Sequence, residues 1–437
     1  MRGFPESDDG TAALPTRILA IGDVHLGRRP SRLPEGLDPE GRLTPAAAWH
    51  ASVESAVAHG ADAVLLAGDL VEEADDLYEA YPELARGVER LHEHGIAVAG
   101  VAGNHDGTVL PRLAESLPAF QLLGAGGRWE AAALAGVEVV GWSFPGLTAS
   151  DNPLAGGLPP RSGERPRIGL LHCDRDQTGS RHAPVRSAEL AAADVDAWLL
   201  GHIHAPDPLA GPRPSGYLGS LVGLDPGEPG AHGPWWLTVH GPGRIEAEQL
   251  PLAPLRWEAV PVDATGLADP DDLHARVIAA LEALHEQLRD RGAAARAVGC
   301  RLRITGRNDA GADLPARLEA TGLAGFQLER DGVTYFVEAL RVETEPALDL
   351  ERLAGGQDPV GLLARRLLLL RRPPGDPERA ELLRRVRPQL EETARKRTYW
   401  ELGQPGALDE ARIAAALEQA ARRALEALLA QDPPGER

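Results

Sequence analysis

Five short apolar runs, each ending at a side chain that can bind a metal, constrain this chain more than any other feature of its sequence. The runs cover residues 17–21, 63–67, 96–101, 167–171 and 196–200. Such runs are typical of buried strands that deliver a loop. Because ligands bind beyond the carboxyl ends of strands in sheets wound with helices, convergence of these strand ends would gather side chains from distant positions.

Helical segments separate the first three runs. Thr44 followed by Pro45 is typical of a helix start, and an alanine-rich segment continues from there to Gly60. Residues 77–94 have helical spacing and are followed by Gly95, which suits a helix C-cap. The alternation of strand and helix predicts an α/β domain with its helices on the outside.

The rest of the chain divides into smaller parts. At 437 residues it exceeds what one hydrophobic core usually supports. We expect residues 1–16 to be a disordered lead-in, 17–255 the catalytic domain, 256–346 a small α+β module and 347–437 a helical C-terminal region. Within the last two parts we expect helices at 267–292, 314–321 and 409–429, and strands at 300–305 and 333–342.

The residues that follow the five runs offer carboxylate, amide and imidazole ligands. They are Asp23, His25, Asp69, Asn104, His172, His202 and His204. Asp69 can bridge two metals through its two oxygens, and Asn104 adds a neutral oxygen to a site rich in negative charge. A lone Gly-Asp or a lone histidine is usually a loop or surface residue, so the prediction depends on the whole ordered set.

This ligand set favours a pair of divalent cations. Nitrogen and oxygen ligands without thiolates suit Mn²⁺, Fe or Zn²⁺, with Mn²⁺ as our first expectation. Two such ions about 3.5–4 Å apart can generate hydroxide at neutral pH and stabilise the charge added to a phosphoryl group. The sequence therefore predicts a dinuclear site that hydrolyses phosphate esters.

The ordered motifs resemble those of the calcineurin-like metallophosphoesterase superfamily over about residues 17–240. The resemblance implies that fold, a metallophosphoesterase sandwich, and two groups of ligands. One metal would be held by Asp23, His25, Asp69 and His204, and the other by Asp69, Asn104, His172 and His202. It also implies two catalytic residues: His105, which would face the substrate and stabilise the transition state or protonate the leaving oxygen, and Asp106, which would orient His105.

Within the superfamily the chain is most similar to DNA repair exonucleases of the SbcD type, especially the YhaO-like branch. Gly22-Asp-Val-His-Leu-Gly27 and Tyr217-Leu-Gly-Ser220 resemble segments of these nucleases. An α+β module and a helical tail then follow, as in that family. The resemblance implies a DNA exonuclease with a capping domain that helps admit DNA. It further implies homodimerisation and a tail that docks on an SMC-like ABC ATPase of the SbcC or YhaN kind.

Two local features qualify the resemblance. Residues 70–73 contain no histidine, whereas eukaryotic and archaeal relatives carry one there, which leaves exonuclease polarity and endonuclease capacity open. The same segment lacks the Asp-Arg-Gly continuation of protein Ser/Thr phosphatases, so that subfamily is disfavoured. Asp174 and Asp176, just after His172, are expected to line the cleft.

Charge and composition keep other functions open. A net charge of -20 argues against nucleic-acid binding over the whole surface and favours, as an alternative, a phosphodiesterase or phosphomonoesterase acting on small nucleotides. In a third interpretation the chain is mainly an assembly partner. Cys173 and Cys300 lie in separate segments, no apolar run approaches the ~18 residues of a membrane span, and no signal peptide is evident. We therefore expect a cytoplasmic protein without a membrane segment.

Overall fold

The structure is a computed structural model that describes residues 14–72, 77–267, 272–308, 322–346, 350–394 and 410–431. These residues divide into two compact units. The first contains two packed sheets with their helices and most of a third sheet, and the second contains the helices from Leu350 onward. Residues 1–13 of the expected lead-in and the helix expected at 314–321 lie outside the described residues. The predicted domain borders stay predictions.

The first sheet has six strands in the order β11-β10-β1-β2-β3-β4. They are β11 (Arg244–Gln249), β10 (Trp235–Gly241), β1 (Thr16–Ile21), β2 (Ala63–Leu66), β3 (Ala97–Gly100) and β4 (Phe120–Leu122). Strands β1 to β4 run parallel to one another, so their carboxyl ends lie along one edge. Strand β10 pairs antiparallel to β1.

The second sheet has five strands in sequence order from β5 to β9. They are β5 (Trp129–Leu134), β6 (Val137–Trp142), β7 (Arg167–His172), β8 (Ala197–Gly201) and β9 (Ser215–Tyr217). Strands β6 to β9 are parallel, and β5 pairs antiparallel with β6. The predicted strands at 167–171 and 196–200 are confirmed as β7 and β8.

The two sheets pack face to face and are covered by helices on their outer faces. Ile18 and Ala20 of β1 belong to a core shared with Val139 and Leu170 of the second sheet. The alternate residue Leu19 packs instead with the outer helices of the first sheet. Burial of both strand faces explains why the sequence shows continuous apolar runs, and the predicted α/β class is confirmed.

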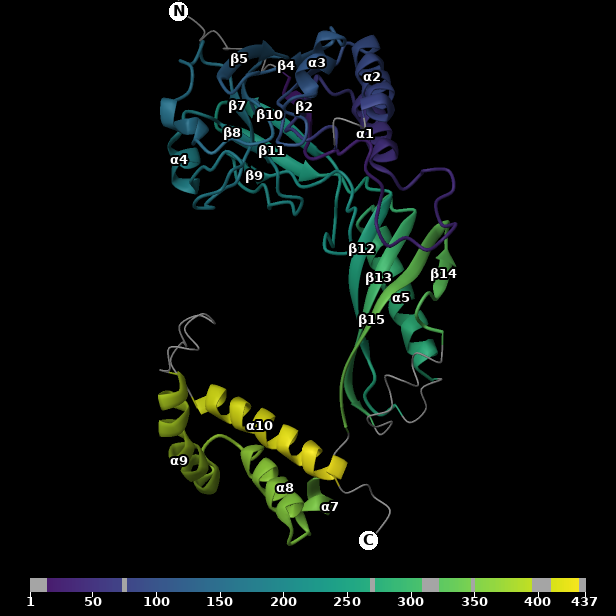
Figure 1. Ribbon diagram of the computed structural model, residues 1–437, viewed down its shortest axis with the longest axis vertical. Helices are drawn as coiled ribbons and strands as arrows, with labels where there is room; N and C mark the ends of the chain where they lie inside the picture. Colours follow the sequence, from purple (N-terminus) through teal and green to yellow (C-terminus); the bar gives the residue numbers. More distant parts are fainter. Residues whose placement is uncertain are drawn as a thin grey trace, which may run out of the picture. The chain divides into compact units, whose positions relative to one another are not determined.

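The covering helices are α1 (Pro45–His59), α2 (Leu77–Glu93) and α3 (Leu110–Glu115) over the first sheet, and α4 (Ser187–Ala192) over the second (Figure 1). A short 3-10 helix spans Pro153–Gly156. The Thr44 side chain caps α1 by accepting a hydrogen bond from the Ala47 amide at 3.4 Å, and Gly60 ends the helix with a φ of 65°. Both ends of α1 are where the sequence predicts them.

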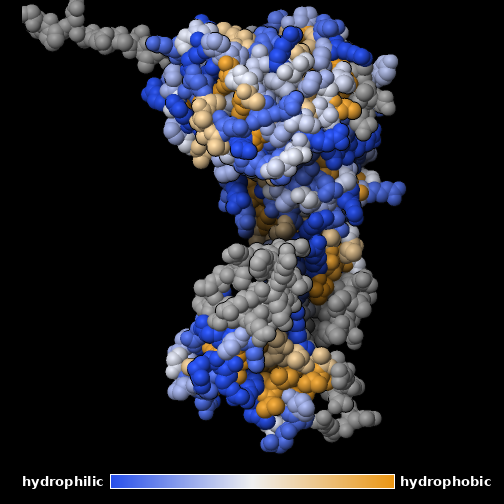
Figure 2. Space-filling model, turned by 60° about the vertical axis from the view of Figure 1, so that its left-hand side comes forward, coloured by the Kyte–Doolittle hydropathy of each residue, from blue (hydrophilic) through white to orange (hydrophobic). Residues whose placement is uncertain are grey.

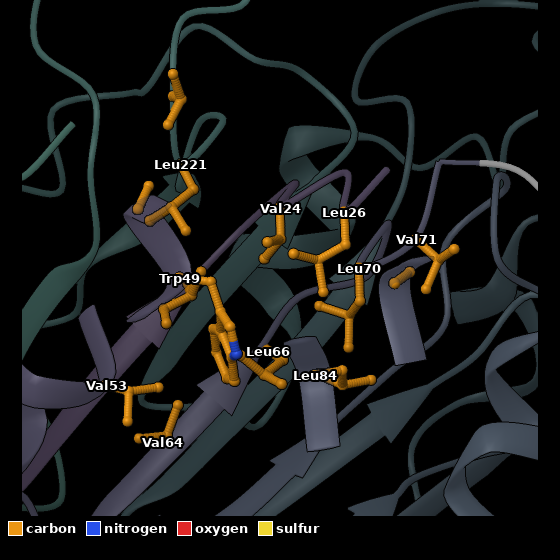
Figure 3. Close-up of a cluster of buried hydrophobic side chains, with 14 of the residues drawn as sticks. Val24, Leu26, Trp49, Val53, Val64, Leu66, Leu70, Val71, Leu84 and Leu221 are labelled. Carbon is orange, nitrogen blue, oxygen red and sulfur yellow. The ribbon is translucent and has the colours of Figure 1, made fainter. Parts of the chain in front are cut away.

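The core beneath α1 and α2 reaches the loops that follow the strands. Figure 3 shows Trp49 of α1 packed among aliphatic side chains, together with Val24, Leu26 and Leu70 from those loops. Trp49 is fully buried, and its Nε1 donates a hydrogen bond to the Glu83 carbonyl at 3.0 Å. This core therefore supports the loops as well as the sheet.

A third sheet follows in the order β12-β13-β15-β14. Its elements are β12 (Leu255–Asp263), α5 (Asp272–Asp290), β13 (Ala297–Asn308), β14 (Gln327–Arg330) and β15 (Val333–Pro346). Trp257 and Phe336 from this sheet belong to the same core as Trp49. Trp257 also donates a hydrogen bond from Nε1 to the Gly223 carbonyl at 2.8 Å. This part of the α+β module is thus built onto the sandwich.

The second unit carries the predicted helical C-terminal region, with α7 (Leu350–Ala354), α8 (Pro359–Leu370), α9 (Pro377–Ala394) and α10 (Glu410–Gln431). Leu350, Leu367 and Leu425 form a small core of its own. Apolar residues also gather on the surface of this region in Figure 2, and Leu362 of α8 is 52% exposed. None of the helices in the described residues is long and apolar enough to cross a membrane.

Replacing Gly87 in α2 by alanine should destabilise the protein, although alanine ordinarily favours a helix interior by about 0.5–1 kcal/mol. A Cβ at this position would lie 2.2 Å from Trp49 Nε1, and buried Trp49 has no room to move away. We expect a loss of about 1–3 kcal/mol in the free energy of unfolding, measured by urea denaturation. The exposed Glu89→Ala in the same helix, expected to change it by less than about 0.5 kcal/mol, is the control. A Gly87→Ala protein as stable as its parent would contradict this packing.

Candidate metal centre

The carboxyl ends of β1, β2 and β3 in one sheet and of β7 and β8 in the other meet at a single site. The structure brings the ligand atoms of Asp23, His25 and His204 within 4.8 Å of one another, and does the same for Asp69, His172 and His202. Nδ1 of His172 lies 3.9 Å from an oxygen of Asp23, so the two groups adjoin.

Asn104 joins the second group. Its Oδ1 lies 3.0 Å from His172 Nε2 and 3.0 Å from His202 Nδ1. An oxygen of Asp69 lies 3.2 Å from the same His172 nitrogen. All seven residues singled out in the sequence as ligands therefore come together, from strand ends belonging to two different sheets.

The loops after β1 and β2 are bound to each other beyond the strands. The His25 amide donates to the Asp69 carbonyl at 2.9 Å, and the Leu26 amide donates to the Leu70 carbonyl at 2.8 Å. Val24, Leu26 and Leu70 point into the core in Figure 3, so the polar residues between them are left to face the site. One loop thereby places a carboxylate and an imidazole side by side.

Several of these residues adopt a backbone conformation that side chains rarely favour. Asp23, His25 and Asp69 have φ values of 42°, 53° and 50°, in the left-handed region. Each of these backbone conformations costs about 1–3 kcal/mol of folding free energy. It persists because the surrounding packing and hydrogen bonds hold the residue in place. Such strain is concentrated where side-chain direction matters most, at the ligands.

Gly103 allows the Asp69 loop to approach the next strand end. A Cβ on Gly103 would lie 2.1 Å from Asp69 Oδ1 and 2.7 Å from His172 Cε1. The glycine that precedes Asn104 is therefore required by the closeness of the ligands themselves. The lack of room for a Cβ is the reason that the residue before Asn104 is a glycine.

Three histidines direct one ring nitrogen to an acceptor and the other to the centre. His25 Nδ1 lies 2.5 Å from Glu72 Oε2, His204 Nδ1 lies 2.7 Å from Glu228 Oε1, and His172 Nδ1 lies 3.1 Å from the Ala67 carbonyl. At His204 and His172 the contact is a hydrogen bond, and an Nδ1–H donor there would leave Nε2 available to a cation, whereas the contact between His25 and Glu72 is an ion-pair contact without hydrogen-bond geometry. Partners of this kind orient metal-binding histidines and increase their basicity.

His202 is oriented the opposite way. Its Nδ1 faces Asn104, whereas its Nε2 lies 3.3 Å from an oxygen of Asp174. The ring of His182 lies next to that of His202, with centroids 4.9 Å apart and the ring planes tilted by 49°. Asp174 thus approaches a candidate ligand, whereas the carboxylate of Asp176 accepts hydrogen bonds from the amide and hydroxyl of Ser187, and the expected lining of a cleft by the two stays a prediction.

The residues fit a bound divalent cation. Nε2 of His25 and Nε2 of His204 face each other at 3.0 Å, although both rings have an acceptor at Nδ1. Two lone pairs at this distance repel each other, whereas two ligands about 2.1 Å from one ion and at right angles lie about 3.0 Å apart. The buried Oδ2 of Asp23 also has no hydrogen-bond partner among the described residues.

The electrostatics of the site also favour a cation. Burial raises the pKa of Asp23, and the nearby charge of Asp69 raises it further. Burial alone would lower the pKa of His172, but the charges of Asp69 and Asp23 raise it to about 9. Buried carboxylates are thus close enough together to oppose each other's ionisation, and positive charge placed between them relieves that repulsion.

His105 and Asp106 lie beside this centre in different roles. The His105 amide donates to Asp69 Oδ1 at 2.9 Å, and its ring Nδ1 lies 3.0 Å from the Glu72 carbonyl. Asp106 is fully buried and accepts hydrogen bonds from the Gly103 amide at 2.7 Å and the Leu70 amide at 2.6 Å. Burial and the charge of Asp69 raise its pKa to about 7.

These contacts correct the expected role of Asp106. Its carboxylate holds the loops after β2 and β3 together by accepting backbone amides, and it is the Glu72 carbonyl that orients the His105 ring. Asp106 is therefore a positioning residue for two ligand loops. His105 remains next to the centre, with its second ring nitrogen free to face a substrate.

Sequence reasoning missed Glu72 and Glu228 as partners of ligand histidines. Glu228 lies in a Gly/Pro-rich stretch without regular spacing, so no pattern marks it. In the structure its second oxygen accepts the Leu224 amide at 2.9 Å, which ties the same carboxylate to the loop behind His204. Glu72 follows Asp69 by three positions, and this short separation in the sequence is the only sign that it lies near the candidate centre.

Comparison with known proteins agrees with this geometry. Residues 16–206 match the calcineurin-like phosphoesterase family. Residues 257–345 match the middle domain of the metallophosphoesterase YhaO. Members of the calcineurin-like family use dinuclear metal sites. The candidate ligands between Asp23 and His204, which form two adjoining groups, fit such a site.

Individual relatives are more distant. The chain is 28% identical over 266 residues to the uncharacterized metallophosphoesterase YhaO of Bacillus subtilis, an alignment that covers 57% of this chain and 63% of that protein. A dimetal phosphatase from Danio rerio and the calcineurin-like phosphoesterase YfkN from Bacillus subtilis are each 13% identical and cover 54% of this chain, with TM-scores of 0.33. The matches cover 99% and 91% of those chains.

Replacing Glu228 by glutamine should weaken metal binding at the candidate centre. The amide keeps the shape of the side chain but loses the charge opposite His204, and its NH₂ group would face the Leu224 amide donor. We expect the Kd for Mn²⁺ to rise about 10–100-fold, measured by isothermal titration calorimetry. Glu54→Gln, at an exposed carboxylate that pairs with Arg90, is the matched control and should leave the Kd unchanged. Equal affinities for the parent and Glu228→Gln would refute the role of Glu228.

Proposed function

We propose that this protein is a metal-dependent phosphoesterase and, more specifically, a DNA exonuclease. The observation that carries the proposal is the convergence of seven nitrogen and oxygen ligands from five strand ends, in two adjoining groups. This arrangement suits two divalent cations, with Mn²⁺ preferred and Fe or Zn²⁺ compatible with the same ligands. A dinuclear site of this kind acts on phosphoryl groups.

A bound pair of cations would supply Lewis acidity toward a phosphoryl group and lower the pKa of water. Asp69 would be a ligand in the second group, where its Oδ2 lies 3.2 Å from His172 Nε2, and its backbone carbonyl accepts the amide of His25 from the first group at 2.9 Å. His105 keeps Nδ1 directed at the Glu72 carbonyl, which fixes its ring. In hydrolysis water adds to phosphorus, a proton of that water passes to solvent, and the P–O bond breaks. The leaving oxygen then takes a proton from Nε2 of the His105 imidazolium.

DNA is favoured as the substrate by the sequence motifs and by the domain order. The segments at 22–27 and 217–220 resemble those of SbcD-type nucleases, and the phosphoesterase domain is followed by a YhaO-type middle domain and a helical region. Tyr217 of the second segment supports the site, since its hydroxyl accepts the Arg175 amide at 2.7 Å and lies 3.2 Å from the Cys173 carbonyl. It thereby fixes the loop that follows His172.

Asp69→Ala and His105→Ala should each abolish degradation of linear DNA by the purified protein with Mn²⁺. Asp69→Ala removes an oxygen ligand from the centre, and His105→Ala removes the proton donor, so we expect losses of at least about 100-fold. Release of labelled nucleotides from single-stranded and duplex DNA is the measurement. His94→Ala, on an exposed histidine whose ring contacts the Arg90 carbonyl, is the control. Absence of nuclease activity in the parent protein, with or without an ATPase partner, would disprove the exonuclease assignment.

A second candidate is hydrolysis of small nucleotides, and the net charge of -20 favours it. The same centre would then act on phosphomonoesters or cyclic phosphodiesters. The two candidates separate in one assay, because a small-nucleotide enzyme should turn over such substrates rapidly with Mn²⁺ while leaving linear DNA intact.

We further propose that the helical C-terminal region docks on an SMC-like ABC ATPase of the SbcC or YhaN kind, in cytoplasmic DNA repair. The region has small apolar cores of its own, and Leu362 is exposed on its surface. Apolar residues gather on the surface of this region in Figure 2, and a contiguous apolar patch of this kind suits a partner. Homodimerisation of the catalytic domain belongs to the same proposal.

Deleting residues 348–437 should abolish complex formation with an SMC-like ATPase from the same genome and spare metal-dependent hydrolysis of a small phosphodiester. Leu362→Glu in the full chain should weaken the complex at least tenfold, because it places a charge on an apolar contact. Arg385→Ala, on an exposed position of α9, is the control. Binding measured by co-purification and calorimetry that survives the deletion would rule out docking through this region.

A further inference from the structure

Three arginines stand close together just after the first ligand loop. Arg28, Arg29 and Arg32 lie within five positions of one another, in the purple segment that precedes α1 in Figure 1. Arg28 is half-buried, and the other two are exposed. They form a local concentration of positive charge in a chain with a net charge of -20.

None of the three guanidinium groups makes a hydrogen bond or ion pair with any residue that the structure describes. Many other arginines of the protein do, as when Arg161 binds Asp194 and Asp196. An arginine carries five N–H donors in a fixed fork that matches phosphate oxygens. The three side chains therefore offer donors that the protein itself does not use.

The segment is attached at one end to the loop that carries His25 and at the other to the loop that carries Glu228, the partner of His204. The Arg28 amide donates to the His25 carbonyl at 3.1 Å. Ser31 donates through its amide to the Leu224 carbonyl at 2.8 Å and through its hydroxyl to Asp225 at 2.8 Å. Because Glu228 of that second loop contacts His204, the arginines lie along a path that begins at the metal centre.

Nearby acidic groups are already engaged. Burial would raise the pKa of Glu72, but the contact with His25 and the charges of His105 and Arg28 lower it. Hydrogen bonds from Gly227 and Ser31 lower the pKa of Asp225, with smaller contributions from Arg301 and Arg32. Both carboxylates therefore have other partners, since Glu72 lies 2.5 Å from His25 Nδ1 and Asp225 accepts hydrogen bonds from Gly227 and Ser31.

We propose that Arg28, Arg29 and Arg32 form a phosphate track that binds the backbone of a DNA strand next to the phosphodiester held at the metal centre. A substrate with one phosphate needs only the centre, whereas a strand presents further phosphates to guanidinium donors anchored beside it. This inference rests on the proposed function and extends it, because it assigns the residues that select a strand over a single nucleotide. Because these contacts are made to phosphates, they would depend on the charge of the DNA backbone and not on its base sequence.

The test is binding of a fluorescent single-stranded DNA oligonucleotide by full-length protein in EDTA, followed by anisotropy over a range of salt concentrations. The triple variant Arg28→Ala/Arg29→Ala/Arg32→Ala should bind at least tenfold more weakly at low salt. The slope of log K against log salt should fall by about 2, since each single-strand phosphate contact contributes about 0.7. The triple lysine variant keeps the charges and should retain most of that slope.

The matched control is Arg112→Ala/Arg128→Ala/Arg291→Ala, which removes three exposed arginines elsewhere in the first unit and changes the net charge equally. It should bind DNA within about twofold of the parent, a difference of about 0.4 kcal/mol. An equal loss in control and track variants would overturn the proposal, because the effect would then be one of net charge. Tighter binding of RNA than of DNA of the same sequence would overturn the assignment to DNA.

A second readout separates this inference from the proposed function. With Mn²⁺ the track variant should lose at least tenfold more activity on a DNA strand than on bis(p-nitrophenyl) phosphate, which has a single phosphodiester. Equal losses on both substrates would overturn the track while leaving the phosphoesterase intact. Failure of the parent protein to hydrolyse either substrate would instead disprove the proposed function.

Discussion

The hydrogen bond from the His25 amide to the Asp69 carbonyl is the contact on which the rest of the site depends. It continues the pairing of β1 with β2 beyond the ends of the strands, into loops that would otherwise diverge. Val24 and Leu26 anchor one loop in the core, and Leu70 anchors the other. Ligands on these loops therefore have directions set by aliphatic packing, and the strained backbone at Asp23 and Asp69 is held by the same contacts.

A second constraint is electrostatic. The centre places two carboxylates and several imidazoles where water is largely excluded, and such groups are costly to bury without compensation. Glu72 and Glu228 add negative charge behind two of the histidines, which makes the inner nitrogens better ligands. The protein thus concentrates negative charge at one edge of the sandwich, and only a cation or a proton can balance it.

The parts of the fold that could be predicted are those whose signal is local. The apolar runs that become β1, β2, β3, β7 and β8 are buried on both faces, so they show as continuous apolar sequence, and Thr44 and Gly60 mark both ends of α1. Strand β5 was missed because its exposed and half-exposed residues give no such run. The division of the strands between two sheets depends on long-range pairing, which the sequence does not display.

At the candidate site too, features with a local sequence signal could be predicted and features that depend on long-range contacts could not. The seven candidate ligands, which the structure brings together, could be picked out because each follows a strand and the order of motifs is distinctive. The role of Asp106 could not be assigned correctly, because adjacency to His105 in sequence suggests a contact that the structure gives to Glu72 instead. Glu228 could not be found because its partner, His204, lies across an irregular segment.

The distribution of ligands between the sheets has a consequence for biosynthesis. The six-stranded sheet contributes Asp23, His25, Asp69 and Asn104, whereas the five-stranded sheet contributes His172, His202 and His204. A nascent chain that has left the ribosome only as far as β6 holds the first group without the second, and it cannot assemble the centre. The complete set of candidate ligands can therefore assemble only after the second sheet has been translated and has docked on the first.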